Sequence, residues 1–222
     1  MIDAIVFDFD GVIADSEMAH YRAFSAVLEP FGIAFTYDEY LQVYIGFDDR
    51  DCVREAFSRA GKALDHGTLP ALCEAKAVAF EALVRAGTET YPGVVELVAS
   101  AAREVPVAIA SGATRADIDL LLAGIDEGRL GPHFRVIVSA DDVIRSKPDP
   151  QTYAMAAEQI GVAARGCLAI EDTPTGVASA AGAGLRTLGV TNTCAAEMLS
   201  KAERVVSSLA GIDLAVLRGW YD

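Results

Sequence analysis

The sequence is poor in the residues that form disulfides and zinc sites. Its 222 residues include only four cysteines, which lie far apart without a CxxC pair, and only three histidines. Such cysteine usage is typical of reduced thiols rather than of disulfides or a structural zinc ion. Because imidazole and thiolate ligands are scarce, we expect any bound metal ion to be held by oxygen atoms.

Positive charge and long apolar runs are scarce as well. Eighteen lysine and arginine residues stand against 32 aspartate and glutamate residues, so the formal net charge is −14. A surface of this sign repels nucleic-acid phosphates and anionic lipids, and we expect neither nucleic acid nor membrane as a partner. No uncharged stretch reaches the roughly 18 apolar residues of a bilayer span, and the N-terminus has no basic signal-peptide region. We therefore expect a cytoplasmic protein and, without a coiled-coil pattern, a monomer.

The sequence does contain enough apolar residues for a large core, with 52% hydrophobic and 23% charged residues. Short runs rich in branched and aromatic residues predict buried strands over residues 4–9, 105–110, 135–139 and 167–170, with 185–190 and 204–206 as two further candidates. Helices are predicted between them, over residues 94–103, 115–122, 150–160 and 176–183. This alternation predicts an α/β fold, a Rossmann-like parallel sheet with helices on both faces.

Residues 15–90, the helical insert, interrupt this alternation because they contain no predicted strand. The helix signals are a cap at Asp15 or Ser16, a stop at Gly32, a capping box from Thr36 to Glu39, and helical patterns over residues 48–60 and 68–86. A crossover between parallel strands is usually one helix with short loops, so the helical insert is not an ordinary crossover. We predict two domains: an α/β core of residues 1–14 and 91–222, and an all-helical cap of residues 15–90.

Polar residues follow the carboxyl ends of the four main predicted strands. They are Asp8 and Asp10 after the first strand, Ser111 and Gly112 after the second, Lys147 in the segment after the third, and Glu171 and Asp172 after the fourth. Open parallel sheets bind ligands at this edge. Four carboxylates in one crevice repel one another unless a cation lies between them, and Mg²⁺ binds a few carboxylates together with waters and a substrate phosphate. The pattern therefore predicts a Mg²⁺ site.

In this order the residues resemble the four motifs of the haloacid dehalogenase superfamily: Asp8-Phe9-Asp10-Gly11-Val12, Ser111, Lys147-Pro148 and Glu171-Asp172. The helical insert after the first motif is similar to the cap of the branch that contains β-phosphoglucomutase and phosphoglycolate phosphatase. The resemblance covers nearly the whole chain. It implies a Mg²⁺-dependent phosphohydrolase that works through a phospho-aspartate.

The chemistry of these residues agrees with that implication. Asp8 would attack phosphorus, and Asp10 would protonate the leaving alkoxide and later deprotonate the attacking water. Ser111 would donate its hydroxyl and its backbone N–H to a phosphoryl oxygen at a helix N-terminus, beside Gly112. Lys147 would neutralise charge on the phosphate and on the nucleophile.

The resemblance also implies the metal ligands, which are Asp8, Asp172 and the main-chain carbonyl of Asp10, with Glu171 left open as a further ligand. Each residue alone has a simpler explanation, since an Asp or Ser after a strand is often a helix cap and a Lys-Pro pair a solvated loop. The conjunction of four motifs at four strand ends favours the functional interpretation.

The helical insert contains a conspicuous lysine. Lys76 lies on the apolar stripe of the predicted helix over residues 68–86, in a chain that has only four lysines. Two interpretations stay open: its ammonium extends from a core helix to solvent, or this helix face closes on the crevice and Lys76 contacts the substrate. The resemblance favours the second, because a cap lysine at this place contacts substrate phosphate or carboxylate in relatives.

Four other residues of the helical insert are candidates for substrate binding. They are Ser16 and His20, one helical turn apart near Asp10, and Gly46 and Arg50 at a loop and helix start. Arg50 resembles the cap arginine of the mutases, although its distance from Gly46 is one residue too long. The neighbouring Asp48 and Asp49 are also explained as charges at a helix start.

We predict a two-domain hydrolase of small phosphate monoesters, of the sugar-phosphate or phosphoglycolate type. A β-phosphoglucomutase-like isomerase shares the same core and stays an alternative. So does a non-catalytic binding protein of the same fold, against which the intact motifs argue. A dehalogenase has no need of Asp10, and a phosphonate hydrolase needs a lysine in the first helix of the insert, whereas the first lysine of this chain is Lys62.

Overall fold

The computed structural model describes residues 1–85 and 87–221, and within them the central element is a parallel sheet. Its strand order is β3-β2-β1-β4-β5-β6. The strands are β1 Ala4–Phe7, β2 Val107–Ala110, β3 Phe134–Val138, β4 Cys167–Glu171, β5 Arg186–Val190 and β6 Arg204–Val206. All five pairings are parallel. The predicted α/β fold is confirmed, including the two C-terminal strands.

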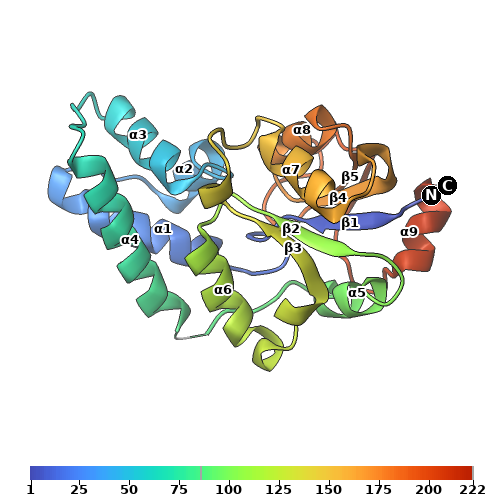
Figure 1. Ribbon diagram of the computed structural model, residues 1–222. Helices are drawn as coiled ribbons and strands as arrows, with labels where there is room; N and C mark the ends of the chain where they lie inside the picture. The colour runs from blue at the N-terminus through green and yellow to red at the C-terminus, as the bar shows by residue number, and fades with distance from the viewer. Residues whose placement is uncertain (86, 222) are drawn as a thin grey trace.

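Helices cover both faces of the sheet (Figure 1). One face is covered by α7 Gln151–Ile160 and α8 Pro174–Gly182, and the other by α5 Val94–Ala101, α6 Arg115–Gly124 and α9 Leu214–Tyr221. Side chains of β1 alternate between the faces, so that Ile5 and Phe7 pack on the side of α5 while Ala4 and Val6 pack on the side of α7. A strand covered on both faces needs apolar residues throughout, which explains its unbroken hydrophobic run. The C-terminal helix α9 was not predicted from the sequence.

The helical insert lies at one end of this layered core (Figure 1). Its helices are α1 Glu17–Leu28, α2 Tyr37–Val43, α3 Asp49–Arg59 and α4 Thr68–Val84, in the predicted order. The predicted end of the last helix at Ala86 lies outside the described residues. The helical insert has a hydrophobic cluster of its own, which includes Phe24, Leu28, Tyr40, Phe57 and Leu72. It therefore buries apolar side chains independently of the sheet.

The helix boundaries follow local signals in most places. The Thr36 hydroxyl accepts a hydrogen bond from the Glu39 N–H at 3.1 Å, as the capping box predicts. Gly32 ends the first helical segment with φ +65°, a left-handed conformation that glycine adopts readily. Ser16, one of the two predicted caps, occupies the N-cap position of α1, but its side chain makes no capping hydrogen bond. No helix among residues 1–85 and 87–221 is long and apolar enough to span a bilayer.

Candidate active site

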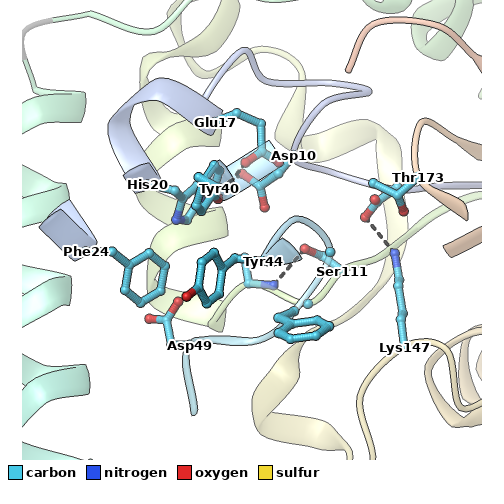
Figure 2. Close-up of a pocket in the computed structure, with 15 residues that line it drawn as sticks. Asp10, Glu17, His20, Phe24, Tyr40, Tyr44, Asp49, Ser111, Lys147 and Thr173 are labelled. Carbon is cyan, nitrogen blue, oxygen red and sulfur yellow. Dashed lines mark hydrogen bonds and ion pairs between the residues drawn. The ribbon is translucent and has the colours of Figure 1, made fainter. Parts of the chain in front are cut away.

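A crevice lies where the carboxyl ends of β1 and β2 meet the helical insert. The sheet side is lined by Asp8, Asp10, Ser111, Gly112, Ala113, Lys147 and Thr173, and the insert side by Glu17, His20, Phe24, Tyr40, Tyr44, Gly46, Phe47 and Asp49. Figure 2 shows Lys147 at one end of the crevice and Phe24, Tyr44 and Asp49 at the other. The structure therefore brings residues from three of the four predicted motifs together at the expected edge of the sheet.

Asp8 and Lys147 form the charged pair at one end of the crevice. The Lys147 ammonium lies 2.8 Å from Asp8 Oδ1 and 2.6 Å from Glu171 Oε1, and all three residues are buried. Burial and the neighbouring Glu171 raise the pKa of Asp8 well above its usual range, in spite of Lys147. Burial would lower the pKa of Lys147, but the two carboxylates outweigh it and raise that pKa. One ammonium thus stands between two carboxylates and neutralises only part of their charge.

Asp172 adds a third buried carboxylate to this group. Ligand atoms of Asp8, Glu171 and Asp172 lie within 4.8 Å of one another. Burial, Asp8 and Glu171 raise the pKa of Asp172 well above its usual range. Its Oδ2 accepts a hydrogen bond from the Thr193 hydroxyl, whereas its buried Oδ1 has no hydrogen-bond partner in the part of the chain that is described. An unpartnered buried carboxylate oxygen beside two other carboxylates fits a divalent cation with oxygen ligands.

Glu171 differs from Asp172 because its oxygens are already engaged. Oε1 accepts hydrogen bonds from Lys147 at 2.6 Å and from the Tyr153 hydroxyl at 2.7 Å. Oε2 accepts one from the Thr173 hydroxyl at 3.1 Å. The geometry therefore favours Asp8 and Asp172 as candidate cation ligands. Glu171 instead binds the ammonium of Lys147.

Asp10 is not part of the three-carboxylate group found among the described residues. Its Oδ1 accepts a hydrogen bond from the Ser16 hydroxyl and lies 3.2 Å from His20 Nε2. Burial would raise the pKa of Asp10, but His20 and Ser16 outweigh it and hold the pKa below its usual range. Ser16 and His20 thus both lie near Asp10, as predicted. His20 lines the crevice, whereas Ser16 contacts the Asp10 carboxylate and is not among the lining residues.

A tight turn at Gly11 follows Asp10 and brings the backbone close to Asp172. Gly11 has φ +78°, and a Cβ at this position would lie 1.8 Å from Asp172 Oδ2. Any other residue would therefore displace the third carboxylate. Gly46, with φ +80°, has a similar role on the insert side, because its Cβ would lie 2.4 Å from the Thr175 hydroxyl. The insert loop approaches the start of α8 closely at this point.

Ser111 offers one donor rather than the two that were predicted. Its backbone N–H already donates to the Val138 carbonyl at 2.9 Å, so the prediction of a free N–H at this residue is wrong. Its hydroxyl oxygen accepts from the Ala113 N–H at 2.9 Å and keeps its own proton for another acceptor. A phosphoryl oxygen in the crevice would be such an acceptor.

Lys76 and Arg50 lie outside the crevice lining. Lys76 is fully buried, with its ammonium 2.9 Å from Asp49 Oδ1 and 3.5 Å from Asp117 Oδ2 of α6, so the interpretation that it extends to solvent is wrong. Burial would lower the pKa of Lys76, but Asp49 and Asp117 outweigh it and raise that pKa. Arg50 pairs with Asp48 at 3.0 Å and lines a second pocket with Arg54 and Arg145, which shares Phe47 and Lys147 with the crevice.

Several residues of the site were not singled out from the sequence. On the insert side they are Glu17 and Tyr40, and on the sheet side Tyr153 and Thr193, whereas Asp49 was considered as a charge at a helix start. The Tyr40 hydroxyl donates to Glu17 Oε2 at 2.7 Å, and burial raises the pKa of Glu17. Thr193 follows β5 as Asp172 follows β4, so the strand-end pattern could have identified it. The other residues reach the site through the packing of helices that are far apart in the sequence, which local patterns do not predict.

The chain matches known proteins over most of its length. The sequence profile of the haloacid dehalogenase-like hydrolase family matches residues 5–190. Protein CbbY of Rhodobacter capsulatus is 31% identical over 189 residues, 83% of each chain. Fructose-1-phosphate phosphatase YqaB of Escherichia coli is 30% identical over 188 residues, 84% of this chain and 95% of that protein. A crystal structure of CbbY from Rhodobacter sphaeroides with xylulose-(1,5)bisphosphate has a TM-score of 0.88 at 28% identity and covers 98% of this chain and 99% of that one.

Proposed function

The chain belongs to the haloacid dehalogenase-like hydrolase family, and from that premise we propose that it is a Mg²⁺-dependent phosphatase of small sugar-phosphate monoesters. One observation carries the proposal. Asp8 lies within 2.8 Å of the Lys147 ammonium and beside Asp172, whose buried Oδ1 has no partner among the described residues. A nucleophile, a fixed positive charge and a place for a cation thus meet at one end of the crevice.

In the first step, a carboxylate oxygen of Asp8 attacks phosphorus and the bond from phosphorus to the ester oxygen breaks. Asp10 gives its proton to the departing alkoxide, so the products are an alcohol and a phospho-aspartate. Ser111 donates its hydroxyl to a phosphoryl oxygen, and Lys147 neutralises charge that builds up there. Asp8 and Asp172 would hold Mg²⁺, which would supply the remaining positive charge.

In the second step, Asp10 accepts a proton from water while the water oxygen attacks phosphorus and the bond to Asp8 breaks. Phosphate leaves and the Asp8 carboxylate is restored. The lowered pKa of Asp10 leaves its carboxylate ionised and free to accept this proton, and it opposes the protonated form that the first step uses. His20 and Ser16 hold the carboxylate where it reaches both the leaving oxygen and the water.

The names of the relatives support the substrate class, because a sugar monophosphate is named for one of them and a sugar bisphosphate for another. The hydrophobic cluster of the helical insert supports the proposal that residues 15–90 form a cap domain over a core of residues 1–14 and 91–222. The four free cysteines support a cytoplasmic location, and the negative net charge supports a protein without nucleic-acid or anionic-membrane partners.

The isomerase alternative requires the crevice to hold a second phosphate. Asp49 lines the crevice and Arg50 does not, which argues against that alternative. Incubation with β-glucose 1-phosphate and catalytic glucose 1,6-bisphosphate separates the two. A phosphatase gives free phosphate or no reaction, and an isomerase gives glucose 6-phosphate without net phosphate release.

The proposal is tested with a panel of phosphate monoesters that includes sugar phosphates, phosphoglycolate and p-nitrophenyl phosphate. Released phosphate is measured with Mg²⁺ and with EDTA, for the wild type and Asp8→Asn. We expect turnover that requires both Mg²⁺ and Asp8. Turnover that survives EDTA, or the absence of turnover on every ester including p-nitrophenyl phosphate, would reject the proposal; the second result would favour the non-catalytic binding protein.

A further inference from the structure

We infer that Asp49 makes the crevice selective for phosphate esters of neutral polyols and disfavours esters that carry a second anionic group. This inference rests on the proposed function and narrows its substrate class. It concerns the end of the crevice opposite Lys147, where Figure 2 shows Asp49 beside Phe24 and Tyr44. A substrate with its phosphoryl group at Asp8 extends its alcohol part toward this end.

The charges that line the crevice are unevenly distributed. Four of the lining residues are acidic, namely Asp8, Asp10, Glu17 and Asp49. Lys147 is the one lysine or arginine among the lining residues that the structure describes, and it is already shared by two carboxylates. A second phosphate or a carboxylate at the far end would therefore meet acidic groups and no free cation.

The two basic residues that could have served a second anion are held elsewhere. Lys76 lies behind Asp49, fully buried between that carboxylate and Asp117, with its ammonium 4.6 Å from the ring centroid of Phe80. Arg50 is paired with Asp48 and lines the second pocket, outside the lining of the crevice. To reach a substrate anion, Lys76 would have to leave Asp49 without its counter-ion.

Asp49 itself is suited to bind hydroxyl groups. Lys76 contacts its Oδ1 at 2.9 Å, and the side chain keeps 16% of its surface exposed at the crevice. A carboxylate oxygen only accepts hydrogen bonds, which a polyol donates and an ionised acid does not. The neighbouring rings of Phe24 and Tyr44 offer apolar surface to the carbon skeleton of such a substrate.

The test compares two ligands that differ in one group. Glucitol 6-phosphate and 6-phosphogluconate are open chains of six carbons, with a hydroxymethyl group in the first where the second has a carboxylate. Each is measured as a competitive inhibitor of p-nitrophenyl phosphate hydrolysis, which does not require that either be a good substrate. We expect the wild type to bind glucitol 6-phosphate at least about tenfold more tightly, as a like charge roughly 6 to 8 Å away implies.

Asp49→Asn removes the charge and should reduce this ratio at least about fivefold, mainly by improving the binding of 6-phosphogluconate. Asp51→Asn is the matched control. Asp51 lies on the same helix and pairs with the exposed Arg54 at 2.9 Å, and it is not among the crevice-lining residues. Its removal changes the net charge equally and should leave the ratio within about twofold.

Equal inhibition of the wild type by the two ligands would overturn the inference, and this result does not depend on the folding of any variant. A ratio that changes equally in Asp49→Asn and Asp51→Asn would overturn it as well. If p-nitrophenyl phosphate is not hydrolysed at all, the proposed function falls and the inference falls with it. If p-nitrophenyl phosphate is hydrolysed but the two ligands inhibit equally, the inference is contradicted and the proposed function is not.

Discussion

The two ends of the crevice are built in different ways. At one end, Asp8, Lys147 and Asp172 lie at or after the carboxyl ends of strands or in the loop before α7, so the sheet backbone fixes their positions. On the insert side of the crevice, Glu17, Tyr40 and Asp49 come from three helices, and side-chain packing and ion pairs fix their positions. This difference agrees with the proposed function, in which residues at the sheet perform the chemistry and residues of the helical insert select the substrate.

The largest effect is expected from the nucleophile at the sheet end. Asp8→Asn should lower kcat about 10²- to 10⁴-fold, or about 3 to 6 kcal/mol, because no other group can form the bond to phosphorus. The fold should persist, since the change removes one of three carboxylates that repel one another. Steady-state kinetics and thermal unfolding measure the two quantities. Wild-type turnover in this variant would refute the mechanism.

Asp10→Asn should show an effect that depends on the leaving group. A sugar phosphate leaves as a poor alkoxide and needs a proton, whereas p-nitrophenyl phosphate needs little protonation. We therefore expect kcat/KM to fall at least about tenfold more on the sugar phosphate. Equal losses on both substrates would remove the acid role of Asp10 in the first step.

Asp172→Asn should raise the stability of the protein without Mg²⁺ and should lower the stabilisation that Mg²⁺ gives. The folded pKa of Asp172 is raised, so its ionisation at neutral pH opposes folding, and the variant should be more stable than the wild type without Mg²⁺ by about 1 kcal/mol. At 100 times its dissociation constant, Mg²⁺ should stabilise the wild type by about 2.7 kcal/mol and the variant far less. Thermal unfolding with EDTA or Mg²⁺ measures both effects.

Asp119→Asn on α6 is the control for that comparison. Asp119 pairs with Arg115 on the surface, where both side chains are more than half exposed, and its loss should change stability little in either state. If the wild type and Asp172→Asn gained the same stability from Mg²⁺, Asp172 would not be a ligand.

The smallest effect concerns the contact between the helical insert and the core. Asp48 caps α3, with its Oδ1 2.8 Å from the Asp51 N–H, and its Oδ2 accepts a hydrogen bond from the Ser146 hydroxyl of the core. Burial would raise the pKa of Asp48, but the hydrogen bonds of Ser146 and Asp51 and the nearby Arg50 outweigh it and lower the pKa. Asp48→Asn keeps the helix cap and removes the charge, so it should cost about 1 kcal/mol at pH 7.

The pH dependence of that cost has a definite sign. Because the folded pKa of Asp48 is lowered, its stabilisation is present above the unfolded pKa near 4 and is lost as pH falls through the folded pKa. Urea unfolding between pH 7 and pH 3 should show the free energies of unfolding of wild type and variant converging at low pH. A constant difference over this range would show that the charge of Asp48 contributes nothing.

The sequence predicts the sheet end better than the helical end for a physical reason. Parallel strands end at one edge, so residues after Phe7 and Glu171 meet whatever the loops between them do. The prediction of a free backbone N–H at Ser111 fails because this N–H donates a hydrogen bond to Val138 at the end of the neighbouring strand. That competition is visible only once the strand pairing is known.

At the helical end, a shift of one residue decides which side chain faces the crevice. Successive residues of an α-helix are rotated by about 100°, so Asp49 and Arg50 at the start of α3 point in different directions. The apolar stripe did indicate that Lys76 lies on a buried face of its helix. Its partner Asp117 is 41 residues away, and nothing in local periodicity predicts that contact.

The most direct test of the account is to trap the phosphoryl group on the protein. Asp10→Asn should slow the attack of water on the phospho-aspartate, so that mixing it with p-nitrophenyl phosphate and Mg²⁺ lets the intermediate accumulate. After an acid quench, mass spectrometry of the peptides should locate one added phosphoryl group on Asp8, absent with EDTA. Release of p-nitrophenol in the first turnover with no phosphoryl group on the protein, or with the group on another residue, would contradict the account.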